Sequence, residues 1–171
     1  MRTVPLHSKK AAGRVALVDD ADYDLVMQYR WYIWERTMAN GTKQGPYATA
    51  NRPGLRPSTV RMHRLLVPDG PGVDHRDGDG LNNQRSNLRP ADKAQNAANA
   101  RKSSATGGGP PSSRFKGVTW DKDRRLWRAE ITAGGIGRNL GRFADEADAA
   151  RAYDAAARES FGEFARVNFS L

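Results

Sequence analysis

Four residues could do chemistry together: the adjacent pair Asp74 and His75, followed by Asn87 and Asn96. Hydrolysis of a phosphodiester needs a cation on the scissile phosphate, a base for the attacking water and relief of charge on the leaving oxygen. Carboxylate and amide oxygens suit hard ions such as Mg²⁺ or Mn²⁺, and imidazole is the natural base near neutral pH. The four residues therefore indicate a phosphodiesterase site with one metal ion.

The local pattern predicts the elements that must position these residues. Asp74 and His75 close a short apolar stretch and point to opposite sides of a strand, so one can bind metal while the other acts as base. A polar loop broken by glycines leads to a second short strand around Asn87, and Pro90 opens a helical run with Asn96 in its middle. We expect Asn87, or a backbone carbonyl of the loop, to fix the tautomer of the imidazole.

Other interpretations of the same stretch are weaker. The simplest is a polar surface loop that holds a chance Asp-His pair. Residues 77–80, D-G-D-G, resemble the start of a calcium loop, but Leu81 occupies the next position that needs an oxygen, and no glutamate follows at the required distance. The sequence contains no P-loop, G-x-S-x-G nucleophile or dinucleotide fingerprint.

The composition favours a polyanionic partner. The 171 residues carry a formal net charge of +9, as is typical of proteins that bind nucleic acid. There is no cysteine, which excludes disulfides and thiolate zinc sites. No apolar run approaches the roughly 18–20 residues of a membrane span, and the first residues lack a signal-peptide core. We therefore expect a soluble protein of the cytoplasm, encoded by a bacterium or a phage.

The pattern of apolar and aromatic residues over residues 4–67 predicts mainly strands. The expected strands lie at residues 14–18, 31–34 and 47–49, and the last two are joined by a turn at Asn40 and Gly41. Asp19 and Asp20 are expected to cap a short helix over residues 21–29.

Three conspicuous side chains of this region have ordinary explanations. Trp31 and Trp34 could stack on bases, but we expect them to anchor the core. His63 could be a metal ligand, but no acid lies at ligand spacing beside it, so we expect a packed, hydrogen-bonded histidine. Four arginines add positive charge in the segment that precedes Asp74 and His75: Arg52, Arg56, Arg61 and Arg64.

A linker divides the chain into two modules. Residues 102–113, K-S-S-A-T-G-G-G-P-P-S-S, are rich in glycine and serine and end in prolines and serines. The predicted domains are therefore a first module over residues 1–101 and a second over residues 114–171.

The second module predicts a three-stranded sheet and one helix. The strands are expected at residues 115–120, 126–132 and 138–143, and an alanine-rich helix follows and stops at Gly162. Along the middle strand Trp127, Ala129 and Ile131 share one face, and Arg128, Glu130 and Thr132 share the other. A helix stripe of small and aromatic residues should cover the apolar face: Ala149, Ala150, Tyr153, Ala157 and Phe161.

Charge within this module is divided between the sheet and the helix. Residues 114–142 carry eight cationic side chains against three acids, whereas residues 143–171 carry three against six. If nucleic acid binds here, it meets the basic sheet, because a small sheet fits the major groove and arginine reads guanine edges. The alternative is a basic sheet that is merely solvated.

The first module resembles the HNH nucleases, close to the phage and intron homing-endonuclease branch. The phrases V-D-H-R-D-G-D-G-L-N-N-Q-R-S-N-L-R and A-Q-N-A-A-N-A-R carry the likeness, with weaker support from V-A-L-V-D-D-A-D-Y-D and M-H-R-L-L. The resemblance implies a ββα-metal (His-Me finger) fold, with Asp74 and Asn96 as metal ligands, His75 as general base and Asn87 as loop brace. Many relatives have histidine at the position of Asn96, and some add another at that of Ala100, so a sparse metal shell is implied.

The second module is similar to the APETALA/ethylene-response-factor DNA-binding domain. The phrases S-R-F-K-G-V-T-W, L-W-R-A-E-I and N-L-G-R-F carry this likeness, and the alanine-rich helix extends it. By matching position, the residues implied to face DNA are Lys116, Gly117, Thr119, Glu130, Thr132 and Asn139. Charge alone adds Arg125, Arg128, Arg138 and Arg142.

Together these observations predict an α+β protein that is a site-specific DNA endonuclease of the homing type. We expect a monomer that acts on double-stranded DNA with one Mg²⁺ or Mn²⁺ ion, no small-molecule cofactor and no membrane partner. The rival hypothesis is a DNA-binding regulator with an inactive nuclease module. A binder of structured RNA is a weaker third, because a flat basic sheet with few exposed aromatics fits duplex DNA better.

Overall fold

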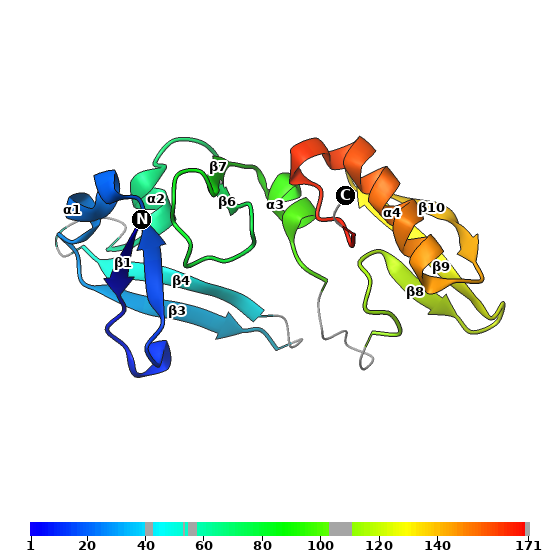
Figure 1. Cartoon of the computed structure of the whole chain (residues 1–171), viewed down its shortest axis with the longest axis horizontal. Helices are drawn as coiled ribbons and strands as arrows, with labels where there is room; N and C mark the ends of the chain where they lie inside the picture. Colours follow the sequence, from blue (N-terminus) through cyan, green and yellow to red (C-terminus); the bar gives the residue numbers. More distant parts are fainter. Residues whose placement is uncertain (40–42, 53, 55–57, 103–110, 170–171) are drawn as a thin grey trace. The chain divides into compact units, whose positions relative to one another are not determined.

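The computed structural model describes residues 1–39, 43–52, 54, 58–102 and 111–169 (Figure 1). Within them the chain forms two compact units. The first contains Met1–Ala39 and Lys43–Asp92, and the second begins at Lys93. The second unit therefore starts one helix earlier than the boundary expected after residue 101. The expected turn at Asn40 and Gly41, and most of the expected linker, lie outside the described residues.

The first unit is built from short strands that form three small antiparallel sheets. The sheets are β1–β2, β3–β4–β5 and β6–β7. The elements, in chain order, are β1 (Arg2–Pro5), η1 (Lys9–Ala11), β2 (Val15–Val18), η2 (Asp20–Asp22), α1 (Tyr23–Val26), β3 (Trp31–Thr37), β4 (Lys43–Asn51), β5 (Thr59–Arg61), α2 (Met62–Leu66), β6 (Val73–His75) and β7 (Leu88–Pro90). The strands expected near residues 14–18, 31–34 and 47–49 are confirmed.

The helix expected over residues 21–29 is shorter than the pattern suggests. A 3-10 turn, η2, precedes a single helical turn, α1, and neither has a side-chain cap. The carboxylate of Asp19 instead accepts hydrogen bonds from the backbone N–H of Arg85 at 2.8 Å and from Gln84 Nε2 at 3.2 Å. The prediction of a capping role was wrong because Asp19 binds a distant loop, while Asp20 accepts from the N-terminal ammonium of Met1 at 2.7 Å.

The core of the first unit lies where β1–β2 and β3–β4–β5 bury their apolar faces. Trp31 is 1 % exposed, and its indole Nε1 donates to the Val26 carbonyl at 2.7 Å. It is therefore the core anchor that was expected. Trp34 lies on the other face of β3 and is half-buried, stacked against Tyr47 with ring centroids 6.0 Å apart.

The second unit contains a helix, a three-stranded sheet and a longer helix. Its elements are α3 (Lys93–Asn99), β8 (Val118–Asp121), β9 (Leu126–Ala133), β10 (Ile136–Phe143), α4 (Glu146–Phe161) and η3 (Gly162–Phe164). The strand order is β8–β9–β10, all antiparallel, and α4 lies along one face of this sheet (Figure 1). Asp145 caps α4, since its Oδ1 accepts from the N–H groups of Ala147 and Asp148 at 2.7 and 3.2 Å.

The alternation expected along the middle strand is present. Ala129 and Ile131 are buried under α4, while Glu130 and Thr132 are exposed on the opposite face. The alanines of α4 allow close packing onto the sheet, as expected. The α+β class is thus confirmed as a mixed fold with small antiparallel sheets. In the part of the chain that the structure describes, no helix has the length and apolar character to cross a membrane.

Candidate active site and DNA-binding face

Strands β6 and β7 place Asp74 opposite Arg89 and His75 opposite Leu88. Asp74 Oδ2 accepts a hydrogen bond from Arg89 Nε at 2.8 Å and lies 2.7 Å from Arg89 Nη2. Both side chains are buried, each about 6 % exposed. A buried carboxylate is tolerated only when it is paired and hydrogen-bonded. Arg89 therefore holds the Asp74 carboxylate in one orientation.

The imidazole of His75 is buried among other rings. The His63 ring meets it edge-on, with centroids 5.0 Å apart at 84°, and the Tyr47 ring lies 6.0 Å away at 33°. Burial lowers the pKa of His75, and interactions with Asn83 and nearby aspartates partly oppose that shift. The ring is consequently neutral near neutral pH, which is the form that a general base requires.

His63 is a packed histidine, as the sequence predicted. It is 6 % exposed, and its ring contacts Tyr47 with centroids 5.3 Å apart. Burial, followed by repulsion from His75, lowers the pKa of His63 to about 3. It therefore supports the rings beside it as a neutral side chain.

Asn87 braces the loop between β6 and β7. Its Oδ1 accepts from the Asp77 N–H at 3.0 Å, and its Nδ2 donates to Asp77 Oδ1 at 3.0 Å and to the Asn82 carbonyl at 2.8 Å. Asp77 also accepts from Asn82 Nδ2 at 2.8 Å. One amide thus ties both ends of the loop together, and its hydrogen-bonding groups are used for that purpose.

Asn83, which the sequence reasoning missed, is the loop amide that interacts with His75. It is completely buried, its Nδ2 donates to the Leu81 carbonyl at 3.0 Å, and its backbone N–H donates to the Leu17 carbonyl at 2.8 Å. Asn83 was overlooked because it stands beside a similar residue, Asn82, and only burial distinguishes the two.

The loop is also clamped from the N-terminal part of the chain. Asp22, buried on η2, accepts from Arg85 Nε at 2.8 Å and from Nη2 at 2.7 Å. The Leu17 N–H on β2 donates to the Leu81 carbonyl at 2.9 Å. Gly80 packs so tightly on β4 that a Cβ there would lie 2.3 Å from the Pro46 carbonyl oxygen. The acidic run V-D-D-A-D was the sequence signal for this clamp.

Asn96 is half-buried on α3 in the second unit, so its role as a partner of Asp74 in binding metal stays a prediction. Among the described residues, no three His, Cys, Asp or Glu side chains form a metal-binding group. A carboxylate and an amide oxygen nevertheless suit a hard ion that keeps several waters.

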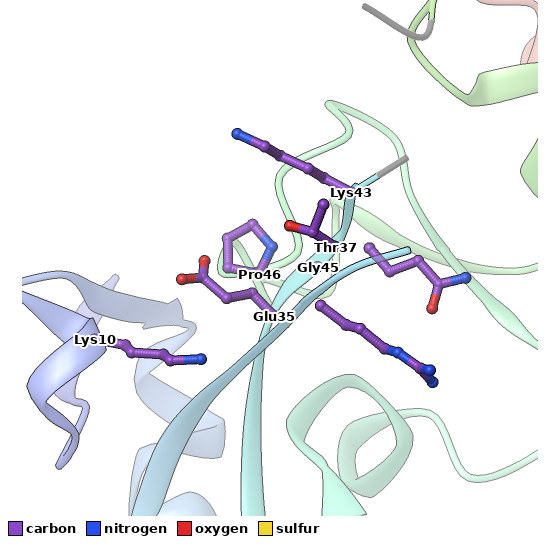
Figure 2. A pocket seen from close by; sticks show the side chains of 8 residues that line it. Lys10, Glu35, Thr37, Lys43, Gly45 and Pro46 are labelled. Carbon is purple, nitrogen blue, oxygen red and sulfur yellow. The ribbon is translucent and has the colours of Figure 1, made fainter. Parts of the chain in front are cut away.

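A pocket in the first unit lies on the β3–β4 strands, apart from these residues (Figure 2). None of the predicted site residues lines it. Its lining consists of Lys10, Glu35, Arg36, Thr37, Lys43, Gln44, Gly45 and Pro46. Its glutamate is paired with Arg14, at 3.3 Å from Nη1. It therefore contributes nothing to the predicted chemistry.

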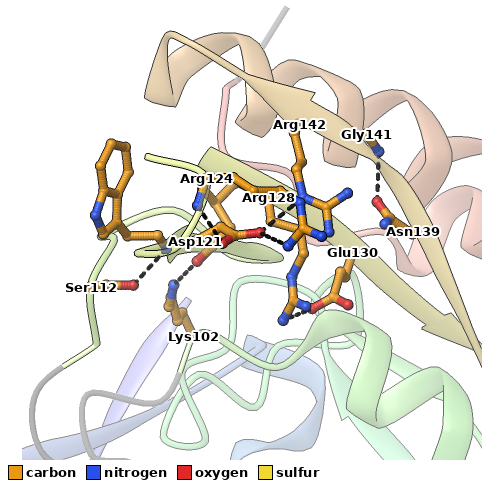
Figure 3. A network of polar contacts seen from close by, with 11 residues as sticks. Lys102, Ser112, Asp121, Arg124, Arg128, Glu130, Asn139, Gly141 and Arg142 are labelled. Carbon is orange, nitrogen blue, oxygen red and sulfur yellow. Dashed lines mark hydrogen bonds and ion pairs between the residues drawn. The ribbon is translucent and has the colours of Figure 1, made fainter. Parts of the chain in front are cut away.

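In the second unit, the sheet face opposite α4 gathers most of the predicted DNA-contacting residues. The pairing register places them side by side: Thr119 opposite Arg128, Arg128 opposite Arg142, and Glu130 opposite Asn139, with Thr132 further along β9. Arg128 pairs with Glu130 at 2.8 Å, and Arg142 Nε donates to Asp121 at 2.9 Å (Figure 3). The acids thus hold the side chains of Arg128 and Arg142 along the surface of the sheet.

Four predicted contact residues lie elsewhere. Arg138 is on the α4 side of the sheet, 3.8 Å from Glu159, because a β-bulge between Asn139 and Gly141 reverses the alternation. Arg125 stands in the β8–β9 turn with φ 55°. Gly117 packs under Tyr153, where a Cβ would lie 1.9 Å from Cδ2, and the Lys116 ammonium donates to the Ala98 and Ala100 carbonyls at 2.5 and 2.7 Å.

Comparisons with known proteins return two viral relatives. Over 167 residues the chain is 30% identical to an uncharacterized HNH endonuclease of Acanthamoeba polyphaga mimivirus, an alignment that covers 93% of this chain and 77% of the relative. Over 102 residues it is 35% identical to Protein 3.8 of Escherichia phage T7, covering 58% of this chain and 78% of that protein. No protein-family model and no solved structure matches the chain.

Proposed function

This chain belongs to the HNH endonuclease family, and on that premise we propose that it hydrolyses phosphodiester bonds of double-stranded DNA with one bound divalent ion. The observation that carries the proposal is the β6–β7 pair, in which Asp74 and His75 are adjacent, buried and held by a braced loop. A surface loop with a chance Asp-His pair would leave both side chains solvated and would not need such a brace.

The proposed roles follow from the chemistry of each side chain. His75 accepts the proton of the attacking water, Asn87 holds the loop in shape, and Asp74 with Asn96 binds Mg²⁺ or Mn²⁺ through oxygen. Arg89 keeps the Asp74 carboxylate oriented for that purpose. The bound ion would polarise the phosphate and stabilise the charge on the leaving oxygen. We expect products with a 5′-phosphate and a 3′-hydroxyl.

Site selection is proposed to come from the second unit, as in an endonuclease of the homing type. The exposed sheet face carries Arg128, Arg142 and Asn139, whose side chains can reach phosphates and base edges. The resemblance to the APETALA/ethylene-response-factor domain implies the same face. Because Arg128 and Arg142 are paired with acids, we expect these ion pairs to be exchanged for phosphate contacts when DNA binds.

The competing function is a DNA-binding regulator with an inactive nuclease module. The Arg89–Asp74 ion pair supports this function, because it occupies one of the two carboxylate oxygens that a metal would use. Two observations argue against an inactive nuclease module. Asp74, His75, Asn87 and Asn96 are all present together, and the loop retains the hydrogen bonds of Asn87 that brace it.

Incubation of the full chain with supercoiled plasmid separates the two functions. With Mg²⁺ or Mn²⁺ present we expect nicked or linear product, and none when a chelator is added. Intact plasmid with every divalent ion tested, despite tight DNA binding, would support the regulator instead.

A further inference from the structure

The C-terminal end of α3, the helix that carries Asn96, is held by contacts within the second unit. The Lys116 ammonium donates to the carbonyls of Ala98 and Ala100, at 2.5 and 2.7 Å. The last carbonyls of a helix have no partner within the helix, and a cation there meets the negative end of the helix dipole. Lys116 therefore acts as the C-terminal cap of α3.

A second lysine makes the reciprocal connection. The Lys102 ammonium donates to the Phe115 carbonyl at 2.6 Å and to the Val118 carbonyl at 2.9 Å. Burial lowers the pKa of both lysines, that of Lys116 to about 8. The two ammonium groups thus cross-link the segment that follows α3 to the segment that leads into β8.

The connection continues into the interior of the second unit. The Lys116 N–H donates to Asn168 Oδ1 at 2.7 Å, and the Lys116 carbonyl accepts from Asn168 Nδ2 at 3.1 Å. Asn168 in turn donates to Asp154 Oδ1, through its N–H at 2.8 Å and through Nδ2 at 2.9 Å. Asp154 is 2 % exposed on α4. Hydrogen bonds therefore link the end of α3 to the buried acid of the longest helix.

We propose that Lys116 is a positioning residue for the metal ligand Asn96, acting through α3. The inference rests on the proposed function and deepens it, because the unit that binds DNA then also holds the helix that carries the ligand. It differs from the role implied by the resemblance to the plant DNA-binding domain, in which Lys116 would contact DNA. The Lys116 ammonium already donates to two carbonyls of the protein, one in the last turn of α3 and one just after the helix.

The test uses full-length Lys116→Met, which keeps the aliphatic stem and removes the donors. Mn²⁺ binding, followed by paramagnetic broadening of the Asn96 side-chain amide signal, should weaken by about tenfold or more, as happens when other residues that orient a metal ligand are replaced. Amide hydrogen exchange at residues 97–102 should accelerate. DNA affinity and its salt dependence should stay at the wild-type values.

Two matched variants sharpen the result. Lys116→Arg should restore Mn²⁺ binding, since a guanidinium can also donate to two carbonyls. Lys122→Met removes an exposed lysine next to β8 and should change neither Mn²⁺ binding nor exchange. Lys116→Gln, which keeps one neutral donor group, replaces Lys116→Met if the latter does not fold.

Unchanged Mn²⁺ binding and unchanged exchange in the Lys116→Met variant would overturn the inference. So would weaker DNA binding with a smaller salt slope, because Lys116 would then bind a phosphate. A different result would show that the proposed nuclease function fails while the inference about Lys116 holds. In that case the wild-type chain would bind Mn²⁺ and lose that binding on Lys116→Met, but would leave plasmid DNA intact.

Discussion

The β6–β7 pair and the β8–β10 sheet use polar side chains in opposite ways. On β6, Asp74 and His75 are buried, and partners from three other segments fix their surroundings. On the sheet, Arg128 and Arg142 remain exposed enough to exchange partners, each paired with one acid. The contrast suggests that the first region is built for one geometry and one protonation state. In the second region, the charged side chains can exchange an acidic partner for a ligand.

The largest expected effect comes from breaking the buried pair. Arg89→Met removes the guanidinium that pairs with the buried Asp74 carboxylate, and removing one partner of such a pair typically costs about 3–5 kcal/mol of stability. Urea denaturation, followed by NMR signals of β3 and β4, should show this loss in the first unit. The double variant Arg89→Met with Asp74→Asn should recover most of it. Equal stability of the single variant and the wild type would show that the pair is solvated.

A smaller effect is expected from the exposed arginines. Arg128→Met combined with Arg142→Met should weaken DNA binding and reduce the slope of log K against log salt by about 0.9 for each phosphate that is no longer neutralised. Arg138→Met is the matched control, because the bulge turns Arg138 toward α4. If Arg138→Met reduced the slope as much as the double variant does, DNA would not be confined to the face opposite α4, and the proposed binding face would be contradicted.

A further effect concerns the pH dependence of the first unit. Burial holds the pKa of His63 at about 3, below its value of 6.5 in an unfolded chain. Between these values the unfolded state binds a proton that the folded state does not, so stability falls as pH drops from about 6.5 toward 3. His63→Gln should make this decline shallower in urea denaturation at pH 7, 6, 5 and 4. A steeper or identical decline would contradict the assignment.

Much of the second unit could be predicted because its pattern is local. Alternation along β9 and the alanine stripe of α4 depend on neighbouring residues only, and both are confirmed. Arg138 shows where local patterns stop being sufficient. Leu140 is the extra residue of a bulge, which reverses the faces of β10. Gly141, at φ 124°, is the residue type that could have signalled it, but alternation alone does not show the insertion.

The surroundings of the candidate site were harder to predict because their partners are remote in the chain. Asp22 and Arg85 are 63 positions apart, and Leu17 pairs with the loop that contains Asn83. Residue type and spacing made Asp74, His75 and Asn87 candidates, but they do not reveal which acid clamps which arginine. The capping role of Lys116 was missed for the same reason, since a basic residue before a strand resembles any other surface lysine.

The proposed role of His75 as the base of a metal-dependent nuclease can be tested directly. The measurement compares His75→Ala with the wild type in parallel assays of plasmid cleavage with Mn²⁺ and of DNA affinity. We predict a fall in cleavage of about 10²–10⁴-fold, the usual contribution of a general base, with DNA affinity unchanged. Metal-dependent cleavage by His75→Ala at the wild-type rate would contradict this role.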